Sequence, residues 1–265
     1  MNRIDEFFDT ARRSKHKALI AYLTVGYPTA DATIEIATAL VDGGCDIIEL
    51  GIPFSDPLAD GATIQRASQR ALEAGVTPSR CLEVAADLRK HVDIPLLFMG
   101  YYNPILHYGM DKFCNASRKS GIDGFIVPDL PPDEGSEAES VMKKQGLDLV
   151  YLVAPTSSSE ERLKLIAGKA RGFIYVVSLK GVTGARSTMS IDLDSLISRI
   201  RGVTDKPLCI GFGISTPEQA QRAARLADGV IIGSRILDIV EKSKRPAADV
   251  KAFISEIRSA IDIIK

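Results

Sequence analysis

Short apolar runs rich in β-branched residues alternate along the chain with longer segments in which apolar residues recur every three or four positions. The short runs predict buried strands, and the longer segments predict amphipathic helices. We expect strands at residues 18–24, 46–50, 94–99, 124–127, 149–153, 173–177, 207–210 and 229–232. Buried strands that alternate with helices form a parallel sheet, and eight such strands close into a barrel.

The predicted helices fill the intervals between these strands. They span residues 30–41, 78–91, 111–119, 132–145, 159–169, 193–201 and 217–227. Additional helices are expected at residues 4–12, before the first strand, at 62–74, after the second, and at 235–240 and 249–264, after the eighth. Side chains that accept a hydrogen bond from the first helical turn predict caps at helix starts. These caps are Thr29, Thr77, Ser158, Thr216 and Asp249.

Composition agrees with this pattern. The 265 residues are close to the ~250 typical of an eight-fold βα barrel. A hydrophobic content of 45% and a charged content of 25% are ordinary for a globular fold with a large core. We therefore expect an α/β protein in which residues 1–265 form a single (β/α)8 TIM-barrel domain. It has an extra helix at the amino terminus and another after the second strand.

Charge and cysteine usage exclude several classes of function. A net charge of -1 gives no attraction to nucleic acid or to acidic lipid. No apolar run approaches the ~20 residues that span a bilayer, and the charged residues 2–6 do not resemble a signal peptide. The four scattered cysteines and three isolated histidines predict reduced thiols and no metal site. We expect a cytoplasmic protein or, in a plant, one of the plastid stroma.

A βα barrel carries its active site at the carboxyl ends of the strands. At the end of the second predicted strand the sequence reads E-L-G-I-P-F-S-D-P-L-A-D-G, from Glu49 to Gly61. Glu49 on the strand and Asp60 in the loop form a candidate general acid/base pair. The alternative is an ordinary strand end followed by a solvated turn. Glu49 favours catalysis, because a glutamate within a buried strand lowers stability unless it has a function.

Glycines after the last two strands predict a phosphate site. Gly211, Phe212 and Gly213 follow the seventh strand, and Gly233 and Ser234 follow the eighth and precede a short helix. Glycine lets backbone N–H groups approach an anion, and a helix amino terminus adds partial positive charge. This pair of loops is the recurrent phosphate site of TIM barrels.

The loop at residues 181–184, G-V-T-G, either adds a third phosphate contact or forms a lid with glycine hinges. Arg235, in the first turn of the short helix, is expected to be solvated and is left out of the site.

Taken together, these motifs resemble the family of tryptophan synthase alpha subunits. The resemblance extends over nearly the whole chain and rests on the Glu49 motif with the T-I-Q that follows, Y-N-P at 102–104, G-V-T-G-A at 181–185, G-F-G-I-S at 211–215 and G-S at 233–234. It implies a carbon–carbon lyase that reversibly cleaves indole-3-glycerol phosphate to indole and glyceraldehyde 3-phosphate by a retro-aldol reaction. It further implies an alpha2-beta2 tetramer in which the beta subunit carries pyridoxal phosphate and receives the indole, with no cofactor in this chain.

The resemblance also assigns roles to residues. Glu49 matches the general acid/base and Asp60 the second catalytic carboxylate, while Tyr175 and Thr183 match positions in the site. The phosphate contacts match Gly184, Phe212, Gly213, Gly233 and Ser234. The positions that enclose the indole match Tyr22, Ile64, Met99, Ile126, Leu152 and Ile231, and for the aliphatic ones a place in the barrel core is an equal alternative. The face that meets the beta subunit matches Asp56, Asn103 and Asp129.

Two positions depart from the family pattern. Ala62 replaces a common proline after Asp60, and Arg235 replaces a small residue beside the phosphate site. Neither changes the two acids. We expect burial to raise the pKa of Glu49 so that it can donate a proton to indole C3, and we expect Asp60, on a more polar loop, to stay ionised and face the indole N–H.

Other functions remain open from the residues alone. Lys180, just past the sixth strand, could form a Schiff base in a class I aldolase. The chain could also act as a stand-alone indole-releasing lyase, or as a binding module that activates its partner.

Overall fold

The computed structural model describes residues 2–157, 159–177, 188–211 and 213–264. Within these ranges eight parallel strands pair in chain order, and the first pairs with the last to close the barrel. The predicted TIM barrel is therefore confirmed. The strands are β1 (Ala18–Thr24), β2 (Ile47–Gly51), β3 (Leu96–Met99), β4 (Gly124–Ile126), β5 (Asp148–Val153), β6 (Ile174–Val177), β7 (Leu208–Gly211) and β8 (Gly229–Ile232).

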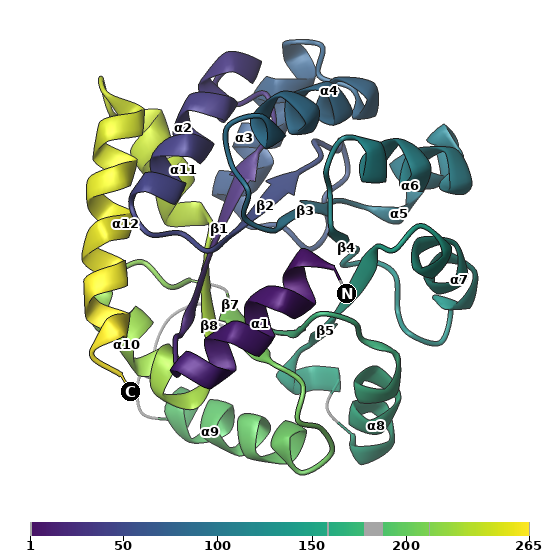
Figure 1. Ribbon diagram of the computed structural model, residues 1–265, viewed down its shortest axis with the longest axis vertical. Coiled ribbons are helices and arrows are strands. Elements are labelled where there is room, and N and C mark those ends of the chain that lie inside the picture. Colours follow the sequence, from purple (N-terminus) through teal and green to yellow (C-terminus); the bar gives the residue numbers. More distant parts are fainter. Residues whose placement is uncertain (1, 158, 178–187, 212, 265) are drawn as a thin grey trace.

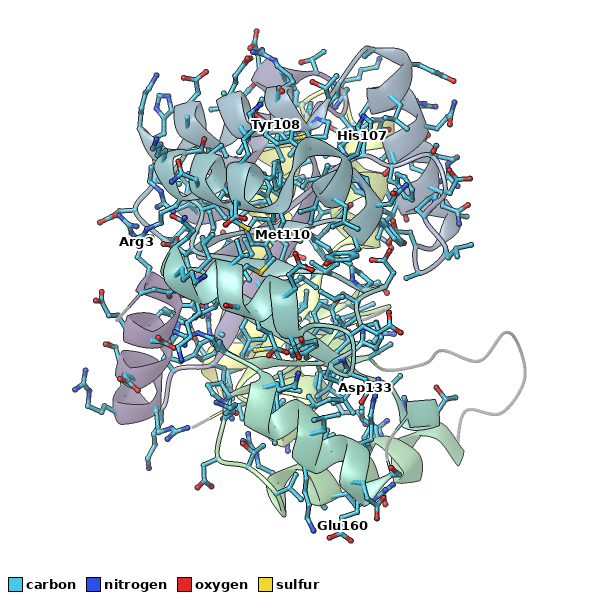
Figure 2. The ribbon with its side chains drawn as sticks, turned by 90° about the vertical axis from the view of Figure 1, so that its right-hand side faces the viewer. Arg3, His107, Tyr108, Met110, Asp133 and Glu160 are labelled. Carbon is cyan, nitrogen blue, oxygen red and sulfur yellow. The ribbon has the colours of Figure 1, made fainter. Side chains whose placement is uncertain are left out.

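Helices surround these strands (Figure 1). They are α1 (Arg3–Ser14), α2 (Ala30–Asp42), α3 (Ala62–Glu73), α4 (Pro78–Arg89), α5 (Tyr102–Tyr108), α6 (Met110–Lys119), α7 (Ser136–Lys144), α8 (Glu160–Lys169), α9 (Thr188–Arg201), α10 (Pro217–Leu226), α11 (Ser234–Lys242) and α12 (Pro246–Asp262), with the 3-10 turn η1 (Pro155–Ser157). In Figure 2, turned by 90°, Arg3 of α1 lies toward one end of the barrel, and His107 and Asp133, which follow β3 and β4, lie toward the other.

All predicted strands are present, with ends within two residues of those expected. Three predicted caps are confirmed, since Thr29, Thr77 and Thr216 each accept a hydrogen bond from the third residue of the following helix. Other helix starts were wrong: Ser159, not Ser158, caps α8, and Arg245, not Asp249, occupies the cap position of α12. Helix α9 begins five residues before its predicted start, and α7 begins four residues after its predicted start. Helix α5 was not predicted.

Register between the strands shows which side chains face the barrel interior, because paired residues of parallel strands point to the same face. Phe98 of β3 and Phe125 of β4 are register partners, and both rings pack against Phe113 of α6. They therefore point outward. The alternate positions, Met99 and its partner Ile126, point inward.

The amino-terminal end of the barrel is closed by α1. The side chain of Ile4 lies beside Gly124, the first residue of β4, and the ring of Phe8 lies 5.6 Å from that of Phe173, just before β6. Both α1 side chains are buried. The carboxyl-terminal end, where active sites of this fold form, lies at the opposite end.

Aspartates at the amino-terminal end follow one repeated arrangement. Asp46, Asp123 and Asp228 each precede a strand, and each carboxylate accepts a backbone N–H from the preceding strand, at 2.8, 3.1 and 2.8 Å. Each also pairs with an arginine from an outer helix, namely Arg258, Arg89 and Arg201. Since their charges are paired, these acids stabilise the fold.

We predict that Arg89→Met lowers the free energy of unfolding by about 3 kcal/mol, because Asp123 is fully buried and would lose its least exposed cationic partner. Methionine retains the apolar stem, so the loss reports on the guanidinium group, which also donates to the carbonyls of Gly121, Val92 and Ile94. Lys90→Met is the matched control, since the Lys90–Asp87 pair is exposed and contributes little. Urea unfolding measures both variants. Equal effects of the two substitutions would contradict a stabilising role for Arg89.

Candidate active site

Glu49 lies near the carboxyl end of β2 and is fully buried. It is the register partner of Tyr22 on β1 and of Leu97 on β3, so it points into the barrel. Neither of its carboxyl oxygens has a hydrogen-bond partner among the described residues. Burial raises the pKa of Glu49 to about 8, as expected from the sequence. At neutral pH this carboxyl group is largely protonated and can donate a proton.

Asp60 lies in the loop that joins β2 to α3 and is partly buried. Burial raises the pKa of Asp60, and the Tyr101 hydroxyl opposes this rise, so that the pKa is about 6. The loop is thus less polar around this carboxyl group than we expected. Asp60 is still mostly ionised at neutral pH. The two acids therefore occupy opposite protonation states there, as a general acid and an anionic partner require.

Tyr22 and Tyr175 lie at the same end of the barrel and are both buried. A methyl group at Gly51 would lie 2.1 Å from the Tyr22 hydroxyl, and one at Gly211 would lie 2.3 Å from the Tyr175 hydroxyl. The glycines of the neighbouring strands thus make room for the two rings. Burial is the main cause that raises the pKa of both phenols, and the negative charges of Glu49 and Asp60 act in the same direction. Both tyrosines therefore stay protonated beside the acids.

The residues expected to enclose an aromatic ring share the inward face. Register links Met99 to Ile126, Ile20 to Ile231 and Leu152 to Tyr175. Met99, Ile126 and Ile231 are buried, whereas Leu152 is half-buried. Ile64, on α3, is half-buried and packs against the core. The structure thus brings the strand residues of this set to the interior surface that Glu49, Tyr22 and Tyr175 also occupy, whereas Ile64 contacts the core from α3.

The predicted phosphate loops follow β7 and β8. Gly213 is exposed and has a φ of 77°, in the left-handed region that favours glycine. Gly233 occupies the cap position of α11 without a side-chain cap, and Ser234 begins the helix. The guanidinium of Arg235 lies 5.9 Å from the ring centre of Phe253 on α12, so it is held on the outer helix layer. Phe212, Thr183, Gly184 and Lys180 lie outside the described residues.

Asp56, Asn103 and Asp129 are all exposed and follow β2, β3 and β4 at the carboxyl-terminal end. Asp129 has a structural role that the sequence did not reveal. Its carboxylate accepts the N–H of Tyr102 at 2.9 and 3.2 Å, and so satisfies the first turn of α5, which lacks a local side-chain cap. Leu58, between Asp56 and Asp60, is 95% exposed. Among the described residues it is the most exposed of the large apolar side chains.

Tyr101 is a site residue to which sequence reasoning assigned no role. It follows β3, is buried, and its hydroxyl accepts the N–H of Ala59 at 2.9 Å beside the carboxyl group of Asp60. Only its position at a strand end could have indicated a role, because its partners are about forty residues away in the sequence.

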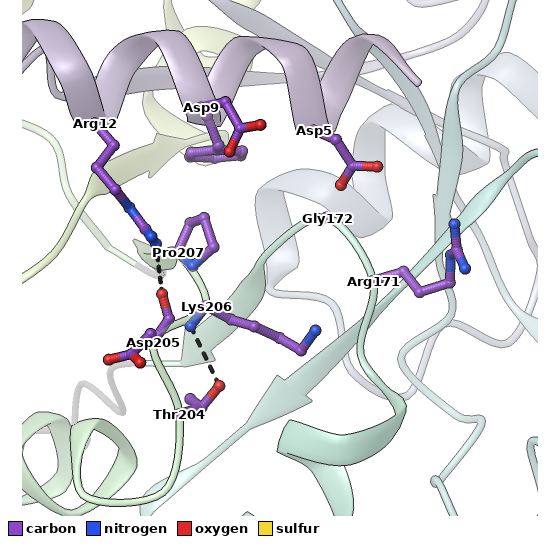
Figure 3. A pocket seen from close by; sticks show the side chains of 10 residues that line it. Asp5, Asp9, Arg12, Arg171, Gly172, Thr204, Asp205, Lys206 and Pro207 are labelled. Atoms are coloured by element: carbon purple, nitrogen blue, oxygen red, sulfur yellow. Dashed lines mark hydrogen bonds between the residues drawn. The ribbon is translucent and has the colours of Figure 1, made fainter. Parts of the chain in front are cut away.

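The amino-terminal end of the barrel contains a cavity that is lined by charged side chains. A cavity of about 540 Å³ lies between α1 and the segments that precede β6 and β7 (Figure 3). It is lined by acids and bases together, including Asp5, Asp9 and Lys206, and Arg12 donates to the carbonyl of Asp205. Because it lies at the amino-terminal end, we do not assign it to catalysis.

The residues that the structure describes contain no group of three or more His, Cys, Asp or Glu side chains placed to hold a metal ion. None of their helices is both long enough and apolar enough to cross a bilayer.

The chain is similar in sequence and in fold to known proteins. Residues 8–262 match the family model described as tryptophan synthase alpha chain. The chain is 52% identical to the tryptophan synthase alpha chain of Dehalococcoides mccartyi, over 99% of this chain and 100% of that protein. It is 49% identical to that of Chloroflexus aggregans, over 99% of both proteins.

Solved structures agree with the sequence comparison. Tryptophan synthase subunit alpha from Legionella pneumophila superposes with a TM-score of 0.92 at 38% identity, covering 100% of both chains. A chain of tryptophan synthase from M. tuberculosis, in an aminoacrylate-bound form, superposes with a TM-score of 0.89 at 35% identity, covering 98% of this chain and 100% of that one.

We predict that Glu49→Gln makes the stability of the protein less dependent on pH. An unfolded glutamate has a pKa of about 4.3, so between about pH 5 and pH 8 the folded protein holds a proton at Glu49 that the unfolded chain has released. The free energy of unfolding therefore decreases as pH rises through this window. The free energy of unfolding of the variant, relative to that of the wild type, should therefore increase by a few kcal/mol from pH 5 to pH 8.

Urea unfolding at both pH values measures this difference. The exposed Glu35→Gln, on α2, is the control and should show no such gain. A Glu49→Gln effect that is the same at pH 5 and pH 8 would contradict the raised pKa.

Proposed function

Because the chain belongs to the tryptophan synthase alpha chain family, it is a lyase that cleaves indole-3-glycerol phosphate to indole and glyceraldehyde 3-phosphate, and we propose that Glu49 and Asp60 perform this cleavage. The observation that carries the assignment is the buried Glu49 carboxyl group, whose oxygens have no partner among the described residues. A buried carboxyl group without a partner lowers stability, and groups of this kind are concentrated at catalytic sites. In this family the pyridoxal phosphate belongs to the beta chain, and the alpha chain holds no cofactor.

Glu49 acts first as an acid. Protonated at neutral pH, it donates its proton to C3 of the indole ring, which weakens the bond between C3 and the glycerol chain. As that bond breaks, its electrons return to the ring, and the Glu49 carboxylate takes the proton of the adjacent hydroxyl group. The products are indole and an aldehyde, and Glu49 ends in its starting state. A pKa of about 8 lies close enough to neutrality for both steps.

Asp60 acts as an anion. Protonation at C3 places positive charge on the ring, and this charge is shared with N1. An ionised carboxylate that accepts the N1–H stabilises the charge. The pKa of about 6 leaves Asp60 mostly ionised at pH 7, which supports this role. The difference between this pKa and neutral pH is smaller than for an aspartate on a solvated loop.

We further propose how the substrate is held. The ring lies against the inward-facing Tyr22, Met99, Ile126, Leu152, Tyr175 and Ile231, with Ile64 of α3 at the margin. The phosphate lies against Gly213, Gly233 and Ser234. The uncapped amino terminus of α11 supports this placement, because its free N–H groups and partial positive charge favour an anion. Thr183, Gly184 and Phe212 complete the proposed contacts.

A beta subunit is the proposed partner, in an alpha2-beta2 tetramer. Its contact surface on this chain includes Asp56, Asn103 and Asp129, with Leu58 beside them. The 95% exposure of Leu58 supports a partner there, because a large apolar side chain gains free energy when a second surface covers it. A stand-alone lyase is the alternative. We propose that residues 1–265 act as one domain in the cytoplasm, where the four buried, free cysteines would stay reduced.

The test is the pH dependence of kcat/KM for indole-3-glycerol phosphate cleavage, measured with and without a beta subunit. We predict a bell with an acid limb near pH 6, from Asp60, and a basic limb near pH 8, from Glu49. Glu49→Gln and Asp60→Asn should each lower turnover by about 100- to 10,000-fold. Glu49→Gln should also remove the basic limb of the pH profile, and Asp60→Asn should remove the acid limb.

Asp31→Asn and Glu35→Gln, two exposed acids of α2, are the matched controls and should leave the bell unchanged. Near-normal turnover in either catalytic variant would remove that residue from the mechanism. Equal rates with and without the beta subunit would favour the stand-alone lyase.

A further inference from the structure

Tyr101 joins two parts of the site that are far apart in sequence. Its hydroxyl accepts the backbone N–H of Ala59 at 2.9 Å, and it lies close enough to the carboxyl group of Asp60 to affect the pKa of that group. A phenol has one proton to donate and two lone pairs, so while the oxygen accepts from Ala59 the O–H remains available as a donor beside Asp60. One side chain after β3 thus holds the loop after β2 at the residue that directly precedes Asp60.

The ring of Tyr101 is itself held on two sides. Phe54, from the same loop as Asp60, lies with its ring centre 5.2 Å from that of Tyr101. On the other side, the backbone enters α5 at Tyr102, whose N–H donates to the carboxylate of Asp129. Tyr101 is 5% exposed, so its ring has little freedom to move.

We propose that Tyr101 is a positioning residue that holds the loop after β2 at Ala59 and so keeps Asp60 at the catalytic rim, with Asp129 fixing the start of the helix that follows Tyr101. The inference rests on the proposed role of Asp60 and adds residues that act through it. It gives Asp129 a function inside this chain in addition to its proposed place at the partner surface.

The Tyr101 hydroxyl also has a defined electrostatic effect. A donor beside the charged form of a carboxyl group stabilises that form, and among the described residues Tyr101 is the neighbour that lowers the pKa of Asp60 against the effect of burial. The other titratable groups that interact with Asp60 are Tyr22 on β1 and Tyr175 on β6, both neutral phenols with raised pKa values. Among the described residues Tyr101 is therefore the group whose loss should most reduce the ionisation of Asp60.

Tyr101→Phe separates the hydroxyl from the ring. The variant keeps the contact with Phe54, and it loses the hydrogen bond with Ala59 and the hydroxyl beside Asp60. Loss of a polar partner beside a charged group changes an equilibrium or a rate on the order of tenfold or more, so we expect kcat/KM to fall about tenfold at pH 6.5. We also expect the acid limb of the pH profile to move up by about 1 pH unit, and the basic limb, which belongs to Glu49, to stay near pH 8.

Tyr102→Phe is the matched control. Tyr102 is the neighbouring tyrosine, it is half-buried, and only its backbone N–H takes part in the contacts described above. It should leave both limbs unchanged. Damage to the fold in Tyr101→Phe would lower the whole profile without moving one limb alone.

Amide hydrogen exchange at Ala59 gives a readout independent of catalysis. Ala59 is exposed, so protection of its N–H depends on the acceptor that Tyr101 supplies. We expect exchange at this amide to be about tenfold faster in Tyr101→Phe, and unchanged in Tyr102→Phe. Asp129→Asn should shift the acid limb in the same direction by a smaller amount.

The outcomes separate the two levels of the account. If Asp60→Asn lacks activity while Tyr101→Phe has a wild-type profile and wild-type exchange at Ala59, the positioning role is wrong and the role of Asp60 stands. If Asp60→Asn keeps normal turnover, the proposed chemistry itself fails, whatever Tyr101→Phe shows.

Discussion

The carboxyl group of Glu49 is enclosed by the interior of the barrel, and its two oxygens have no hydrogen-bond partner among the described residues. This desolvation is the constraint on which the chemistry depends, because it holds a proton on a glutamate at a pH where a solvated glutamate has lost it. It also explains the surroundings. Tyr22 and Tyr175 stand beside the acid as neutral phenols, and Gly51 and Gly211 leave space for their hydroxyls.

Acidic side chains at the two ends of the barrel differ in the partners that surround them. At the amino-terminal end Asp46, Asp123 and Asp228 are paired with arginines and backbone amides, which compensates their charge. At the carboxyl-terminal end Glu49 has no such partner among the described residues, and Asp60 lies beside the phenol of Tyr101. A paired acid, Asp46, thus directly precedes β2, and Glu49, without a partner in the described part of the chain, lies within it. The first kind of acid stabilises the fold, and for the second we propose a role in the reaction.

Local pattern was enough to predict the barrel and the position of Glu49, because strands buried on both faces read as apolar runs and a glutamate within one is conspicuous. It was not enough for α5. The segment Y-N-P reads as a turn, yet Pro104 lies in the first turn of the helix, where its missing N–H costs nothing. The group that satisfies this turn is Asp129, 27 residues away. Tyr101 was given no role for the same reason, since its contacts with Ala59 and Asp60 exist only after β2 and β3 have paired.

The central claim is that Glu49 is protonated at neutral pH in the folded protein, and a ¹³C NMR titration of the glutamate carboxyl carbons measures this directly. The account predicts one carboxyl resonance that titrates near pH 8 in the wild type and is missing in Glu49→Gln. If every glutamate carboxyl group of the folded wild-type protein has lost its proton by about pH 6, well above the reference pKa of about 4.3, the general-acid role of Glu49 is contradicted.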